Sequence, residues 1–166
     1  MGYQLREVSV PILPRGASDI RILHFSDLHL TPRRKKEIAD IKSWASLNPD
    51  LVISTGDFLA HRDAVETALN SLNELLDRPG LYVFGSNDYY APRFKNPLTY
   101  LQKDDGVRKL GSKLPTEELD RELTQRGWIN LNNRKGSISI KNIDIDIRGT
   151  DDAHLELDDY SKVAGT

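Results

Sequence analysis

Three short apolar segments recur at regular intervals in the first half of the chain, and their spacing limits the possible folds more than any other feature. They are Ile20–Phe25, Leu51–Thr55 and Leu81–Phe84. Apolar residues at helical spacing lie between them, over residues 36–47 and 65–76. Strand starts about thirty residues apart are typical of strand–helix–strand units, which make parallel sheets with right-handed connections. The pattern therefore predicts an α/β fold built on a βαβαβ parallel sheet.

The second half of the sequence predicts one more helix and a hairpin. Residues Pro115–Arg126 are expected to form a helix with Thr116 as its N-cap and Gly127 after its end. Residues 89–114 show no clear periodicity and predict a long loop that is functional or partly disordered. At the other end, the alternating residues Leu5–Val10 predict a short strand. Three further strands and a two-residue turn are expected after the helix: Trp128–Leu131, Ser137–Ile140 and Ile143–Ile147, with the turn at Lys141-Asn142.

Composition excludes several classes of protein. The 166 residues are 38% hydrophobic and 29% charged, which is typical of one soluble globular domain. Cysteine is absent, so disulfides and thiolate metal ligands are ruled out. A formal net charge of −2 argues against a general nucleic-acid binder. The sequence has neither a signal peptide nor an apolar run long enough for a transmembrane helix, so we expect a cytoplasmic or peripheral membrane location.

Residues able to bind a metal come directly after all three predicted parallel strands. Asp27 and His29 follow the first strand, Asp57 the second, and Asn87 and Asp88 the third. In open α/β sheets the carboxyl ends of the strands share one edge, where ligands bind, so these side chains are expected to converge. Carboxylate, amide and imidazole groups suit manganese, iron, zinc or magnesium. One aspartate can bridge two cations, and two cations about 3.5–4 Å apart suit hydrolysis of a phosphate ester.

The same residues resemble three motifs of the calcineurin-like metallophosphoesterases. Asp27-Leu28-His29 is similar to the family's D-x-H, Gly56-Asp57 to its G-D, and Gly85-Ser86-Asn87-Asp88 to its G-N-H-D/E. The resemblance covers about residues 20–90 and is closest to a bacterial, often membrane-associated branch. It implies that Asp27 and His29 bind the first metal ion, that Asp57 bridges, and that an amide of the third motif binds the second ion.

The sequence departs from the family pattern in two places. Ser86 aligns with the family's asparagine ligand, and Asn87 aligns with its catalytic histidine. We favour Asn87 as the ligand, because an amide carbonyl binds a cation better than a hydroxyl does, and Ser86 is the alternative. The family's later G-H-x-H histidines have no counterpart, since His154 is the one histidine after Asp88. The resemblance therefore implies that residues 1–166 are a single phosphoesterase domain truncated at its C-terminus, about the first two-thirds of a longer protein.

The family fold is a two-sheet sandwich, so the βαβαβ unit is expected to form one sheet. The predicted hairpin would begin the second sheet, whose C-terminal part is missing, and its exposed edge predicts self-association, marginal stability or completion by residues of another chain. Of the remaining histidines, His24 lies in an apolar segment and is expected in the core, and His61 is expected at the surface.

These observations predict a metal-dependent hydrolase that acts on phosphate mono- or diesters through a dinuclear site and a metal-bound hydroxide. Two divalent ions are expected, or one where the absent histidines leave the second position incomplete. Activity of this chain alone is expected to be weak or absent for the same reason. Two alternatives stay open: a non-catalytic remnant that still binds metal, and a receiver-like signalling module in which an aspartate at a strand end accepts a phosphoryl group.

Overall fold

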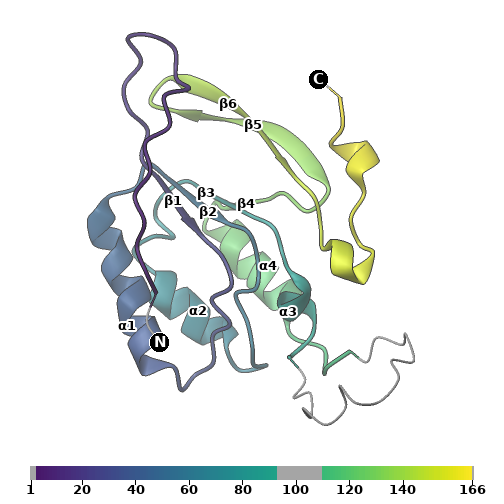
Figure 1. Cartoon of the computed structure of the whole chain (residues 1–166). Helices are drawn as coiled ribbons and strands as arrows, with labels where there is room; N and C mark the ends of the chain where they lie inside the picture. Colours follow the sequence, from purple (N-terminus) through teal and green to yellow (C-terminus); the bar gives the residue numbers. More distant parts are fainter. Residues whose placement is uncertain (1–2, 93–109, 166) are drawn as a thin grey trace, which may run out of the picture.

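A parallel sheet lies at the centre of the structure, and it contains the three parallel strands that the sequence predicts (Figure 1). The computed structural model describes residues 3–92 and 110–165. The first four strands form the parallel sheet in the order β1-β2-β3-β4, and β5 pairs with β6 in an antiparallel sheet. Their bounds are Ile22–Phe25 for β1, Leu51–Ser54 for β2, Gly80–Tyr82 for β3, Ile129–Asn130 for β4, Arg134–Ile140 for β5 and Ile143–Gly149 for β6.

Helices connect the parallel strands and cover one face of their sheet (Figure 1). Because the crossovers after β1 and β2 each contain a helix, the predicted βαβαβ unit is confirmed, and β4 adds a fourth parallel strand. Within the described residues, no helix is long and apolar enough to cross a bilayer. The α-helices are α1 (Lys35–Ser43), α2 (Val65–Leu72), α3 (Ser86–Tyr89) and α4 (Thr116–Gln125), and the 3₁₀ helices are η1 (Trp44–Leu47), η3 (Ala153–Leu155) and η4 (Tyr160–Lys162).

The two faces of the parallel sheet support two hydrophobic cores in the described part of the chain. Alternate residues of a strand point to opposite faces, so Val52 and Tyr82 pack toward the helices. Leu51 and Leu81 point the other way and pack against Ile147 and its neighbours in the β5–β6 hairpin. The hairpin therefore lies over the second face, as expected for the start of a two-sheet sandwich (Figure 1).

Two expectations about burial and pairing are wrong. Residues 5–10 form no strand, and Leu5 and Val8 are 64% and 70% exposed. His24 is exposed instead of buried, and its Nε2 lies 3.0 Å from the Thr55 hydroxyl. His24 is exposed because the core under the hairpin is formed by side chains of β2 and β3 and not of β1. Ile22, on the same face of β1 as His24, is likewise 49% exposed.

The ends of the later elements agree with the sequence in most details. Lys141 and Asn142 both have positive φ angles, of 50° and 62°, as a tight hairpin turn of this kind requires. Gly127 follows α4 with a φ of 86°. Thr116 is the first residue of α4 and not its N-cap, because its hydroxyl donates to the Asp88 carbonyl oxygen at 2.5 Å. Most of the predicted loop over 89–114 lies outside the described residues.

Candidate metal centre

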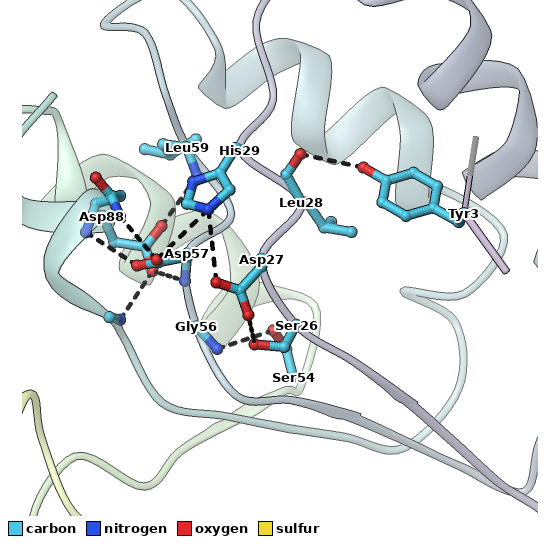
Figure 2. Close-up of polar contacts among 12 residues, drawn as sticks. Tyr3, Ser26, Asp27, Leu28, His29, Ser54, Gly56, Asp57, Leu59 and Asp88 are labelled. Carbon is cyan, nitrogen blue, oxygen red and sulfur yellow. Dashed lines mark hydrogen bonds and ion pairs between the residues drawn. The ribbon is translucent and has the colours of Figure 1, made fainter. Parts of the chain in front are cut away.

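The loops that follow β1 and β2 run side by side past the end of the sheet (Figure 2). The Asp27 amide donates to the Gly56 carbonyl oxygen at 3.1 Å, and the His29 amide donates to the Asp57 carbonyl oxygen at 2.9 Å. Gly56 has a φ of 99°, and a Cβ there would lie 2.5 Å from the Gly85 nitrogen. A glycine is therefore required where these loops meet the loop after β3.

Asp27, His29 and Asp57 form a group whose ligand atoms all lie within 4.8 Å of one another. The His29 Nε2 lies 3.5 Å from Asp27 Oδ1 and 3.7 Å from Asp57 Oδ2. The side chains of Asp27, His29 and Asp57 are 65%, 32% and 16% exposed, so the group opens to solvent on the side of Asp27. Two carboxylates and one imidazole at this spacing fit a divalent cation of the manganese, iron, zinc or magnesium type.

All three residues of the group have a left-handed backbone. The φ angles are 57° at Asp27, 44° at His29 and 58° at Asp57. Aspartate and histidine are among the residues that enter this region most readily, yet a non-glycine residue there still costs of order 1–3 kcal/mol. The cost is offset by the hydrogen bonds between the loops, and such strain is typical of functional sites.

Asn87 lies against Asp57 and holds both of its carboxylate oxygens. The Asn87 backbone amide donates to Oδ1 at 2.9 Å, and its side-chain Nδ2 donates to Oδ2 at 2.8 Å. These contacts place Asn87 beside the group, and its role as a metal ligand, with Ser86 as the alternative, stays a prediction. The contacts add a function that the sequence did not indicate, because they fix the plane of the Asp57 carboxylate.

Asp88 also follows the third strand, but it is not part of the candidate metal group and has a structural role that the sequence did not indicate. Its carboxylate is fully buried and accepts the backbone N–H groups of Asp57 at 2.8 Å, Leu59 at 3.1 Å and Gly85 at 3.1 Å. Burial raises the pKa of Asp88 to about 7, against the lowering effect of these donors. Asp88 thus joins the second and third loops, and the sequence marks its position only as the last residue of the third motif, without indicating these backbone contacts.

Other polar residues take supporting or separate positions. The Ser26 hydroxyl donates to Asp27 Oδ2 at 2.5 Å and so orients the most exposed carboxylate of the group. His61 is exposed and accepts the Asp63 backbone N–H through Nδ1 at 3.1 Å, as expected of a surface histidine. His154 is not part of the candidate metal group.

Comparison with known proteins agrees with this fold. Residues 20–159 match the family described as calcineurin-like phosphoesterase. This chain therefore belongs to the calcineurin-like phosphoesterase family, as its three loop motifs predict.

Two curated relatives carry the description "Transmembrane protein with metallophosphoesterase domain". The protein from Bos taurus is 32% identical over 94 residues, covering 54% of this chain and 21% of the relative. The protein from Danio rerio is 32% identical over 89 residues, covering 51% of this chain and 20% of the relative. The matched region spans about a fifth of the length of these relatives.

Proposed function

We propose that this chain is a divalent-metal-dependent phosphoesterase that hydrolyses phosphate mono- or diesters. The observation that carries the proposal is the convergence of Asp27, His29 and Asp57 within 4.8 Å in a chain of this family. A phosphoester substrate is implied by the family. The same finding favours a phosphoesterase over the receiver-like alternative, in which His29 has no function.

Each residue of the proposed site has its own role. Asp27 and His29 would hold one cation, and Asp57 would be shared between this cation and a second one. Asn87 would offer its Oδ1 to a second cation, since its Nδ2 donates to Asp57. When bound, the cations lower the pKa of a water molecule and neutralise charge on the phosphate. Asn87 stands where the family has a catalytic histidine, but its amide has no titratable proton, so the leaving group takes its proton from another source.

We expect slow turnover from this chain alone. The four side chains Asp27, His29, Asp57 and Asn87 are fewer than two complete metal shells require, since even a four-coordinate zinc site uses three or four protein ligands. A metal-binding chain without catalysis is the limiting case, with one ion bound instead of two. The proposal treats residues 1–166 as one domain. A cytoplasmic or membrane-surface location and self-association through the edge of the β5–β6 sheet stay predictions.

Metal titration of the purified chain tests the proposal. After dialysis against EDTA, manganese binding is followed by calorimetry or by the EPR signal of free Mn²⁺, and saturable binding near neutral pH is expected. Asp57→Asn should weaken it sharply, because Asp57 is the bridging ligand. Asp144→Asn, on the exposed outer side of β6, is the matched control and should bind like the wild type.

Hydrolysis of a model phosphodiester with excess Mn²⁺ then measures the activity. A wild-type chain that takes up no divalent metal would refute the proposed function. Robust turnover would instead show that the four donors suffice and that the expectation of slow activity is wrong.

A further inference from the structure

Tyr3 connects the N-terminal segment to the candidate metal centre. Its hydroxyl donates to the Leu28 carbonyl oxygen at 3.1 Å (Figure 2). Its ring packs edge-on against Trp44, with the ring centroids 5.2 Å apart, and Trp44 in turn contacts Phe25 in the core. Tyr3 is therefore held by the core, although the residues that follow it are largely exposed: Leu5, Val8, Val10 and Ile12.

The Leu28 carbonyl belongs to the peptide group that joins Leu28 to His29, one of the two peptide groups between Asp27 and His29. The N–H of the same peptide group is that of His29, and it donates to the Asp57 carbonyl oxygen at 2.9 Å. A peptide group is planar, so hydrogen bonds at both its C=O and its N–H fix its orientation. Tyr3 supplies one of these two bonds, and the loop after β2 supplies the other.

The orientation of this peptide group sets the direction in which the His29 imidazole leaves the backbone. The residues on either side of Leu28 both have a left-handed backbone, with φ angles of 57° at Asp27 and 44° at His29. The Leu28 side chain is fully buried, so the loop has little freedom to adjust around it. A rotation of the peptide group would therefore move His29 away from Asp27 and Asp57.

We propose that Tyr3 is a positioning residue of the metal centre, which it supports by holding the Leu28–His29 peptide group. This inference rests on the proposed function, because it requires that His29 binds a cation. Burial raises the pKa of Tyr3, so its hydroxyl stays protonated and available as a donor at neutral pH. The role of Tyr3 is indirect, since its hydroxyl contacts the Leu28 backbone and not the side chains of Asp27, His29 or Asp57.

Tyr3→Phe tests the inference, because it removes the hydroxyl and keeps the ring on Trp44. Tyr160→Phe is the matched control, since Tyr160 is 71% exposed and lies in η4. Manganese affinity is measured by calorimetry at 25 °C, and thermal unfolding is measured in EDTA. We expect the Kd of Tyr3→Phe to rise about 10-fold, as is typical when a residue that orients a ligand is changed. The Kd of Tyr160→Phe should equal that of the wild type.

The two measurements separate positioning from plain stabilisation. If Tyr3→Phe lowers the unfolding temperature in EDTA but binds manganese with wild-type affinity, Tyr3 is only structural and the inference is wrong, while the proposed function stands. If the wild type itself binds no manganese, both the proposed function and this inference fail.

Discussion

Replacing Gly85 with alanine is the sharpest test of the geometry around Asp57. Gly85 has φ and ψ angles of −108° and 175°, an extended conformation that alanine adopts without strain. A Cβ at this position would lie 2.3 Å from Asp57 Oδ1 and 3.0 Å from its Cγ. Because non-bonded heavy atoms prefer about 3.5 Å, the Asp57 carboxylate would have to move by about 1 Å.

A displacement of this size should weaken metal binding strongly. Metal–ligand distances tolerate about 0.2 Å, and displacing the groups around a ligand typically lowers affinity about 10–100-fold. We therefore expect the Mn²⁺ dissociation constant of Gly85→Ala to rise at least about 10-fold, or about 1.4 kcal/mol. Calorimetric titration of the EDTA-treated protein measures it. In the control Gly136→Ala, the nearest atom to the new Cβ is Ile147 Cγ1 at 4.0 Å, so wild-type affinity is expected. Equal affinity for Gly85→Ala and the wild type would refute the reasoning.

Two further predictions concern stability. Asp88→Asn should lower the free energy of unfolding by about 1–3 kcal/mol in a urea titration, because the amide cannot accept all three backbone N–H groups that the carboxylate accepts. An unchanged urea midpoint would contradict the proposal that Asp88 joins the two loops. The Arg21 backbone N–H and the Lys141 ammonium lower the pKa of Asp50, so its carboxylate stabilises the fold above the unfolded pKa of about 3.9 and loses this effect as the pH falls below it. Asp50→Asn should therefore unfold at a lower temperature than the wild type at pH 7 and at the same temperature near pH 2. The control Asp144→Asn should unfold close to the wild-type temperature at either pH. If the unfolding temperature of Asp50→Asn is still lower than that of the wild type near pH 2, the ionised Asp50 carboxylate is not the source of the stability.

The parallel sheet was predictable because buried strands leave a strong signal. Strands of a parallel sheet covered on both sides are typically continuous apolar runs, and β2 and β3 lie within such runs or one residue outside them, whereas the segment of β1 is only mostly apolar. The alternation of apolar and polar residues over 5–10 gave a wrong prediction of a strand. A strand forms only where a second strand pairs with it, and the alternation of one segment says nothing about a partner. The burial of His24 was predicted wrongly for a related reason, since it depends on how far the hairpin extends over the sheet.

The candidate site was predictable only in part. The approach of Asp27, His29 and Asp57 follows from their places after parallel strands, a rule that requires no side-chain detail. The partner of the Asn87 amide depends on a rotamer, and the sequence contains no signal for it. The contact of Tyr3 with Leu28 joins residues 25 positions apart, from a segment without regular structure. The sequence contains no local signal for a contact at this separation.

The left-handed backbone at Asp27, His29 and Asp57 also restricts how this site can change in evolution. Asparagine and glycine accept that conformation readily, whereas valine, isoleucine and threonine do not. Substitutions at these positions are therefore expected to favour asparagine and glycine, which preserve the shape of the loops but remove the negative charge of Asp27 and Asp57. A descendant protein could in this way lose the capacity to bind a cation and still keep its architecture, so an intact fold is weaker proof of catalysis than the identity of these three side chains.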